Sequence, residues 1–302
     1  MNTIGSFLLA VLVWPGLIVS ALLGWTYLWM GRKLTARLQG RQGPPFFQPF
    51  FDFVKLAGKK TIVPVGVNPG LFYGLPLVAV LGVVFALALL PLPGNLTPSF
   101  SGDLILVVYL LEMPGICTVL AGYASRSLYG QVSASREAVM LLGYNLPFLA
   151  ALIALAVQAG SFELAKIAAA PWSPVHILAG LAFLISIPAR IRSNPFSIPN
   201  AEQEIVAGAT TEFNGLPLAL FELAHGMELV GMLGLFAALF FPSLISGGLG
   251  LVWYVLISLV LVVLVTVLAV STARLRLNQA FRFYWLWGAL TAVAAFAAAV
   301  IW

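Results

Sequence analysis

Eight apolar runs, most of them about 20 residues long, constrain the fold of this chain more than any other feature. An α-helix rises about 1.5 Å per residue, so a run of this length crosses the roughly 30 Å hydrocarbon core of a bilayer. The runs therefore predict an all-α membrane protein with about eight transmembrane helices. The expected spans are residues 5–30, 71–91, 103–124, 138–159, 174–189, 217–241, 249–271 and 282–302.

The composition agrees with lipid surroundings. Hydrophobic residues make up 61% of the 302 residues and charged residues only 8%, whereas soluble domains carry about 25% charged residues. The formal charge of +5 does not indicate a nucleic-acid partner, because the basic residues lie at the ends of apolar runs and not on one solvated face. We expect one polytopic membrane domain covering residues 1–302.

The basic residues predict the orientation of the chain. Every Lys and Arg except Lys166 falls in a loop that follows the first, third, fifth or seventh predicted helix. The positive-inside rule then places these loops in the cytoplasm and both termini outside. The two longest of these loops cover about residues 31–70 and 190–216.

The first long loop contains a predicted amphipathic helix. After Pro49, apolar residues recur at helical spacing and charged residues occupy the other faces. Such a helix lies on the bilayer surface and does not cross it. It either anchors the chain to lipid or forms one wall of a site between membrane and cytoplasm. The apolar positions are Phe50, Phe53, Val54 and Ala57, and the charged positions are Asp52, Lys55 and Lys59.

Ionisable residues within the predicted spans indicate a path for protons or ions. A charge at the bilayer centre costs about 2.5–3.5 kcal/mol on insertion scales, so such residues usually have a function. Glu222, His225 and Glu228 are three residues apart and share one side of a helix, and Glu112 lies in the third span. In the structural alternative, Glu222 and Glu228 lie near a helix end and neutralise loop arginines.

Ligands for a cofactor are scarce. Cys117 is the single cysteine, and one thiolate cannot hold an iron–sulfur cluster. The Glu-x-x-His pattern of Glu222 and His225 also occurs in di-iron bundles, but a second histidine is needed and only His176 remains. We therefore expect no metal, no cofactor and no catalytic residue on this chain, so that any redox centre belongs to a partner.

Four blocks of sequence carry a family resemblance. They are "RKLTARLQGRQGP" with "QPFFDFVKL", then "AGYASRSLYGQVSASREA", "NPFSIPNAEQEIVAGATTEFNG" and "STARLRLNQ". In this order they resemble motifs of the H subunit of respiratory complex I and of the related membrane subunits of energy-converting nickel–iron hydrogenases and sulfane-sulfur reductases. The blocks run from residue 32 to residue 279.

The resemblance implies a membrane anchor beneath a peripheral electron-transfer arm. Iron–sulfur clusters, and a nickel–iron site in the hydrogenase branch, would belong to peripheral subunits on the cytoplasmic side. Antiporter-like subunits and lipid would be the neighbours in a prokaryotic cell membrane. The chain would link electron transfer from ferredoxin to translocation of protons or sodium ions.

Departures from the complex I pattern favour the hydrogenase or sulfane-sulfur-reductase branch. Three residues separate Pro44 from Gln48 where complex I subunits carry a longer insert, and "SREA" looks like the hydrogenase form. Several acids of the complex I pattern are replaced by Gly31, Asn145, Arg190, Ser197, Asn200 and Asn278. The alternatives are the quinone-chamber H subunit of complex I, a stand-alone secondary transporter and a purely structural anchor.

Three groups of candidate site residues follow. The interfacial loop and chamber group is Arg41, Gln48, Asp52, Lys55, Arg136 and Glu137. The partner-facing group is Glu202, Glu204 and Glu212, and the predicted proton path is Glu112, Glu222, His225 and Glu228.

Overall fold

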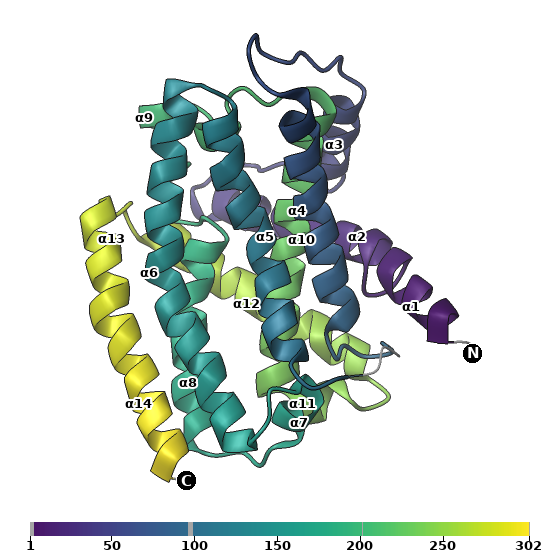
Figure 1. The fold of residues 1–302 in the computed structure, drawn as a ribbon, viewed down its shortest axis with the longest axis vertical. Coiled ribbons are helices and arrows are strands. Elements are labelled where there is room, and N and C mark those ends of the chain that lie inside the picture. The colour runs from purple at the N-terminus through teal and green to yellow at the C-terminus, as the bar shows by residue number, and fades with distance from the viewer. Residues whose placement is uncertain (1–2, 96–98, 201, 302) are drawn as a thin grey trace.

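The computed structural model describes residues 3–95, 99–200 and 202–301, and every regular element in these ranges is a helix (Figure 1). The all-α prediction is therefore confirmed. The long helices are α2 (Leu17–Leu38), α4 (Pro69–Leu89), α5 (Asp103–Ala124), α6 (Leu128–Ala159), α8 (Pro174–Arg190), α10 (Gly215–Phe240), α12 (Gly250–Ser271) and α14 (Ala289–Ile301). The short ones are α1 (Thr3–Leu12), α3 (Gln48–Ala57), α7 (Leu164–Ala169), α9 (Glu202–Ile205), η1 (Gly208–Thr210), α11 (Pro242–Ile245), α13 (Leu277–Phe283) and the π-helical turn η2 (Tyr284–Gly288).

Within the described residues, seven helical segments are long and apolar enough to cross a membrane, and α8 is a shorter apolar helix. Together they match the eight predicted spans. The first span consists of α1 and α2, which are separated at Pro15 and Gly16 because these residues interrupt helical hydrogen bonding.

Two helices extend beyond their predicted ends. α2 continues to Leu38 instead of residue 30, and α6 begins at Leu128 instead of residue 138. Hydropathy marks only the part of a helix that lies in lipid, whereas Arg, Lys, Gln and Leu favour the helix in water as well. These two corrections place Glu137 well inside α6 and not at its start.

Helix α10 lies at the centre of the bundle and contacts α2, α4, α5, α8 and α12. Of its most apolar window, 94% is buried by the rest of the chain. Of the polar side chains of α10, Glu228 is buried by the protein and His225 is half-buried, whereas Glu222, in the first third of the helix, is exposed. Helices α6, α8 and α14 pack together on one side of the bundle, and α1 and α2 extend obliquely on the other (Figure 1).

A close crossing of α2 and α10 depends on two glycines. A Cβ atom at Gly24 would lie 2.6 Å from the carbonyl oxygen of Gly226. Small residues allow membrane helices to approach until their backbones touch. The crossing brings the polar end of α2 beside the polar residues of α10.

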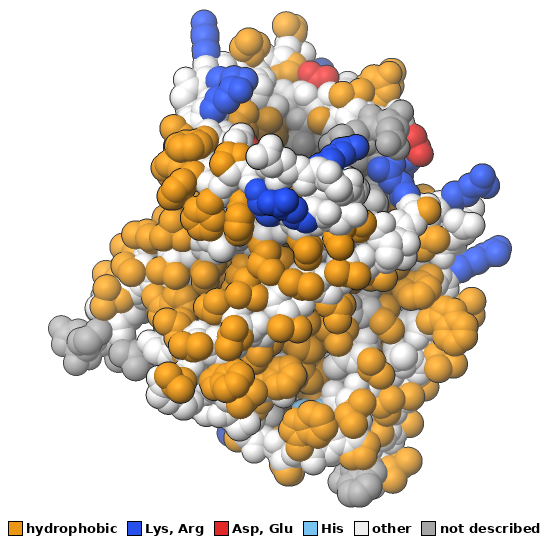
Figure 2. All heavy atoms as spheres, turned by 180° about the vertical axis from the view of Figure 1, so that it is seen from behind, with side chains coloured by type: hydrophobic (Ala, Val, Ile, Leu, Met, Phe, Trp, Pro, Cys, Tyr) orange, Lys and Arg blue, Asp and Glu red, His pale blue; other side chains and the backbone are white. Residues whose placement is uncertain are grey.

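The two long loops lie at one end of the molecule, together with α3 and α9, and α7 and α11 lie at the opposite end (Figure 1). We call the first of these the basic end. Figure 2 shows most of the visible Lys and Arg side chains near this end, above a broad apolar belt. The common location of the loops agrees with the predicted alternation of helices across a bilayer.

Contacts between the long loops hold the basic end together. Asn214 accepts a hydrogen bond from the Ile62 N–H and donates one to the Ile62 carbonyl, both 2.8 Å long. Gly215 follows with φ +60°, and a Cβ there would lie 2.5 Å from Thr61 Oγ1. Only glycine fits this position without strain, because the backbone is left-handed and the space is occupied.

The predicted amphipathic helix is α3. Trp25 of α2 packs against Phe50 and Phe53, with ring centroids 5.3 and 5.5 Å apart. Phe51 and Val54 remain exposed to the surroundings. The helix is thus fixed to the bundle on one face and presents apolar side chains on another, as an interfacial helix requires.

Candidate functional site

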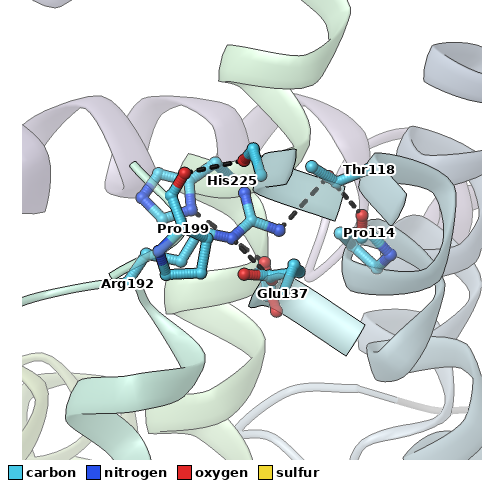
Figure 3. A network of polar contacts seen from close by, with 8 residues as sticks. Pro114, Thr118, Glu137, Arg192, Pro199 and His225 are labelled. Carbon is cyan, nitrogen blue, oxygen red and sulfur yellow. Dashed lines mark hydrogen bonds and ion pairs between the residues drawn. The ribbon is translucent and has the colours of Figure 1, made fainter. Parts of the chain in front are cut away.

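A buried ion pair connects α6 to the loop after α8. Arg192 Nε donates a hydrogen bond of 2.9 Å to Glu137 Oε1, and an Arg192 terminal nitrogen lies 3.2 Å from Thr118 Oγ1 of α5 (Figure 3). The two charged side chains are only 11% and 3% exposed. A pair removed from water in this way is stable only with both partners present.

The backbone of the loop after α8 directs Arg192 inward. Arg192 has φ +53°, and its N–H bonds to the Ala189 carbonyl. A left-handed non-glycine residue costs about 1–2 kcal/mol, so the buried contacts of this side chain have to offset the strain. Farther along the loop, Ser133 of α6 donates a 2.7 Å hydrogen bond to the Pro199 carbonyl.

Arg192 supplies a permanent positive charge. Burial lowers the pKa of its guanidinium, but the nearby carboxylates of Glu137 and Glu228 raise it by more, so the pKa lies above its ordinary value. The group stays protonated at every physiological pH. It can attract carboxylates and repel protons, but it does not carry protons itself.

A second buried pair joins Arg190, the last residue of α8, to Glu112 of α5. The Arg190 side chain is fully buried, and its guanidinium carbon lies 4.3 Å from the Phe148 ring centroid and 5.8 Å from that of Tyr144. Aromatic faces stabilise a desolvated guanidinium. Glu112, predicted as part of a proton path, therefore has a fixed cationic partner.

The three polar residues of α10 surround a small cavity at the edge of this cluster. The cavity has a volume of about 60 Å³, and its walls include Thr118, Arg192, Glu222, His225 and Glu228. One water molecule occupies about 30 Å³ of liquid, so one or two could fit. His225 Nδ1 and Glu228 Oε2 are 4.0 Å apart, a distance that a bridging water or a small rotation can close.

Two of these residues also face other hollows. Glu222 lines a crevice of about 310 Å³ between α2, α3 and α10, together with Arg32, Asp52 and Lys55. His225 lines a crevice of about 460 Å³ between α2, α10 and α12. The small cavity is therefore separated from each crevice by one ionisable side chain.

The six residues of the predicted interfacial group lie in four separate places. Asp52 accepts a 2.8 Å hydrogen bond from Gln48 and lies 3.2 Å from Arg32, and Lys55 lines the same crevice. Arg41 lines the other crevice. Glu137 lies in the buried cluster, and Arg136 is elsewhere.

Arg136 contacts the predicted partner-facing group. Its guanidinium lies 2.6 Å from Glu204 Oε2, and both side chains are accessible. The hydrogen bond from Arg136 lowers the pKa of the Glu204 carboxyl. Glu212 is half-buried and accepts a hydrogen bond from Asn214 through its carbonyl. Glu202 begins α9, and its side chain lies outside the described part of the structure.

Sequence reasoning missed the roles of Arg190, Arg192 and Thr118. The two arginines counted only as topology signals, and Arg190 also as a departure from the complex I pattern. One signal was present in the sequence. In "PARIR" the two arginines follow the fifth apolar run without a polar spacer, so they were candidates to pair with an acid inside the membrane such as Glu112. The pairing itself depends on how α5, α6 and α8 pack.

Comparison with known proteins agrees with this architecture. The family described as NADH dehydrogenase matches residues 9–300. An H subunit of NADH-quinone oxidoreductase from Syntrophobacter fumaroxidans is 32% identical over 278 residues, covering 85% of this chain and 84% of the relative. The corresponding H subunit from Rhodospirillum rubrum is 32% identical over 281 residues, covering 84% and 81%.

A solved structure is similar over almost the whole chain. A chain from the membrane-bound sulfane sulfur reductase, an archaeal respiratory membrane complex, superposes with a TM-score of 0.87 at 28% identity, covering 99% of this chain and 100% of that one. The family match, the relatives and this likeness agree with the four sequence motifs. The chain belongs to the NADH dehydrogenase family, as a multi-pass membrane subunit of the complex I-like type.

Proposed function

We propose that this chain is the membrane-anchor and coupling subunit of a ferredoxin-linked, energy-converting redox complex of the sulfane-sulfur-reductase or hydrogenase type. The structural likeness to the archaeal sulfane sulfur reductase supports this branch. The observation that carries a coupling role is the cavity bounded by Glu222, His225, Glu228 and Arg192. A purely structural anchor has no need of three ionisable side chains around one small cavity.

The proposed path begins at the basic end. A proton from water in the crevice beside Asp52 binds the Glu222 carboxylate, passes to a ring nitrogen of His225, and leaves the other ring nitrogen for Glu228. Imidazole can accept on one nitrogen while it donates from the other, which suits a relay. Arg192, which lines the same cavity, would attract each carboxylate as it gives up its proton.

The coupling would be electrostatic. Iron–sulfur clusters in peripheral partner subunits would supply the electrons, and each added negative charge near the basic end would favour proton uptake by Glu222. The buried pairs of Arg192 and Arg190 would hold the charges around the path in place. Glu112, held by Arg190, would influence the charge at the inner end of the path. It would not carry every proton itself.

The partners follow from the same proposal. Peripheral iron–sulfur and hydrogenase-like large subunits would dock on Glu202, Glu204 and Glu212 at the basic end, facing the cytoplasm. Antiporter-like membrane subunits and lipid would cover the exposed apolar faces of the bundle, and both termini would lie outside. Residues 1–302 would act as one domain.

The quinone-chamber H subunit of a complex I is the second candidate. The relatives named as H subunits of NADH-quinone oxidoreductase favour it, as does the crevice of about 310 Å³ between α2, α3 and α10. In that case the crevice beside Glu222 would admit quinone. The replaced acids at Ser197 and Asn200 are the argument against it.

The test is reconstitution of the complex that co-purifies with this chain after mild detergent extraction. Reduced ferredoxin is added to proteoliposomes with polysulfide, protons alone or quinone as the electron acceptor. Sulfide, hydrogen and quinol are then measured beside uptake of protons or sodium ions. We expect sulfide or hydrogen together with ion uptake. Quinol formation would select the second candidate, and ion transport by the chain without iron–sulfur partners would overturn both.

A further inference from the structure

The crevice between α2, α10 and α12 has the character of a lipid site. It has a volume of about 460 Å³ and adjoins the crevice that contains Asp52, with which it shares Leu28 and Arg32 of α2. Its walls come from helices that cross the membrane, so it opens toward a bilayer leaflet and not only toward water. An amphipathic molecule of that leaflet is therefore in direct contact with it.

The residues of the crevice change character along its length. The basic-end part is polar, with Arg32, Thr35, Gln39, Arg41 and Ser193. The deeper part is mainly apolar, with Leu229, Leu233, Leu261, Val262 and Val265 beside the polar groups of Tyr27, His225 and Thr266. A ligand with a polar head and a hydrocarbon chain matches this division.

The charge of the polar part of the crevice favours a ligand with an anionic headgroup. No carboxylate lines this crevice among the described residues, whereas two guanidinium groups do. Arg32 shares its charge with Asp52 at 3.2 Å, but Arg41 forms no ion pair within the described part of the chain. Guanidinium groups bind phosphate through paired, charge-assisted hydrogen bonds.

We propose that this crevice holds one phospholipid with an anionic headgroup, taken from the leaflet at the basic end. The phosphate contacts Arg41 and Arg32, and one acyl chain follows the leucines and valines of α10 and α12. A neutral isoprenoid quinone would fit the apolar part but would leave the Arg41 guanidinium without an acceptor, since Arg32 already has Asp52.

Such a lipid would also close one side of the proposed path, a consequence that rests on the proposed function. His225 lines both this crevice and the small cavity. A hydrocarbon chain beside His225 would exclude water there, so protons would reach the cavity only past Glu222. The lipid would then prevent a leak from the leaflet.

The test measures bound lipid and needs neither electron transfer nor ion movement. The full chain, in the assembly in which it purifies, is titrated with phosphatidylglycerol or with phosphatidylcholine of the same acyl chains, and native mass spectrometry counts the lipids retained. Inorganic phosphate serves as a competitor without a chain. We expect one phosphatidylglycerol that phosphatidylcholine and phosphate do not displace.

Two pairs of variants localise the site. Arg41→Gln should weaken this binding about fivefold, the effect of one basic residue near a membrane surface, whereas Lys60→Gln, an exposed residue outside the crevice, should not. Gly31→Leu should fill the crevice, because a Cβ there meets only Thr266 Oγ1 at 3.5 Å. Gly74→Leu, which meets nothing within 4 Å, is its control.

The proposal is overturned if both lipids are retained equally or if inorganic phosphate displaces phosphatidylglycerol. It is also overturned if Arg41→Gln and Lys60→Gln have equal effects, or if the crevice retains a quinone instead. Arg41 is exposed, so its variant keeps the test valid even if Gly31→Leu does not fold. The two proposals can fail separately. If the complex bound the lipid as expected but its electron transfer moved no ions, only the proposed function would be wrong.

Discussion

Arg192 and Glu137 are 55 residues apart in the sequence, yet Arg192 Nε lies 2.9 Å from Glu137 Oε1, with both side chains buried. The pair attaches the loop after α8 to the first third of α6. It also brings a permanent positive charge to the cavity that Glu222, His225 and Glu228 surround. Fold and candidate function therefore depend on the same contact.

Removal of one partner of this pair should be costly. Glu137→Gln leaves the guanidinium of Arg192 buried without its counter-charge, and such changes typically cost about 3–5 kcal/mol. Unfolding in mixed detergent should show a much lower midpoint for this variant than for Glu204→Gln, whose pair with Arg136 is exposed. Equal midpoints for the two variants would show that the buried pair does not stabilise the fold.

The crossing of α2 and α10 should not tolerate a methyl group. Gly24→Ala places a Cβ only 2.6 Å from the Gly226 carbonyl oxygen, so the helices have to separate at a cost of about 1–3 kcal/mol. Gly74→Ala in α4 meets nothing within 4 Å and should leave stability unchanged or slightly higher. Thermal unfolding of both variants measures the difference, and the same loss in each would contradict the proposed close contact.

The contact between Arg136 and Glu204 should weaken in acid. Because the hydrogen bond from Arg136 lowers the pKa of Glu204, the contact contributes fully above the ordinary carboxyl pKa and is lost as pH falls through the lowered value. A nitroxide on Ala207→Cys should therefore become more mobile toward acidic pH. In a Glu204→Gln background the mobility should be high and independent of pH, and a retained pH step would assign the effect to another group.

Asn214→Ala should loosen the first long loop. The variant removes both hydrogen bonds to Ile62, each with a net contribution of about 0.5–1.5 kcal/mol. Trypsin should then cleave after Lys59 or Lys60 several times faster, while cleavage after Arg276 stays constant. Unchanged cleavage at the two lysines would show that other contacts hold the loop.

The sequence predicted the spans well because insertion into lipid depends on hydropathy alone, which each residue contributes locally. It predicted the ends of α2 and α6 poorly. Charged residues such as Arg32 and Arg136 end an apolar run, but they do not end a helix, so both helices continue beyond the run. Glu222, His225 and Glu228 were recognisable, because an ionisable residue stands out in an apolar run.

The pairs within the site were not predictable from the sequence. Arg136 and Glu137 are neighbours in the chain, but successive residues of a helix point about 100° apart. One therefore reaches Glu204 at the surface and the other reaches Arg192 in the core. Only the packing of α5, α6 and α8 determines which acid meets which arginine.

The most direct test of the account is the number of ions moved per electron in proteoliposomes that contain the complex with Glu228→Gln. Glu163→Gln is the matched control, because Glu163 pairs with Lys166 at the opposite end of the molecule. We predict that Glu228→Gln retains most of the electron transfer and loses most of the ion uptake, while the control keeps both. An unchanged ratio of ions to electrons in Glu228→Gln would contradict a coupling role for the α10 cavity.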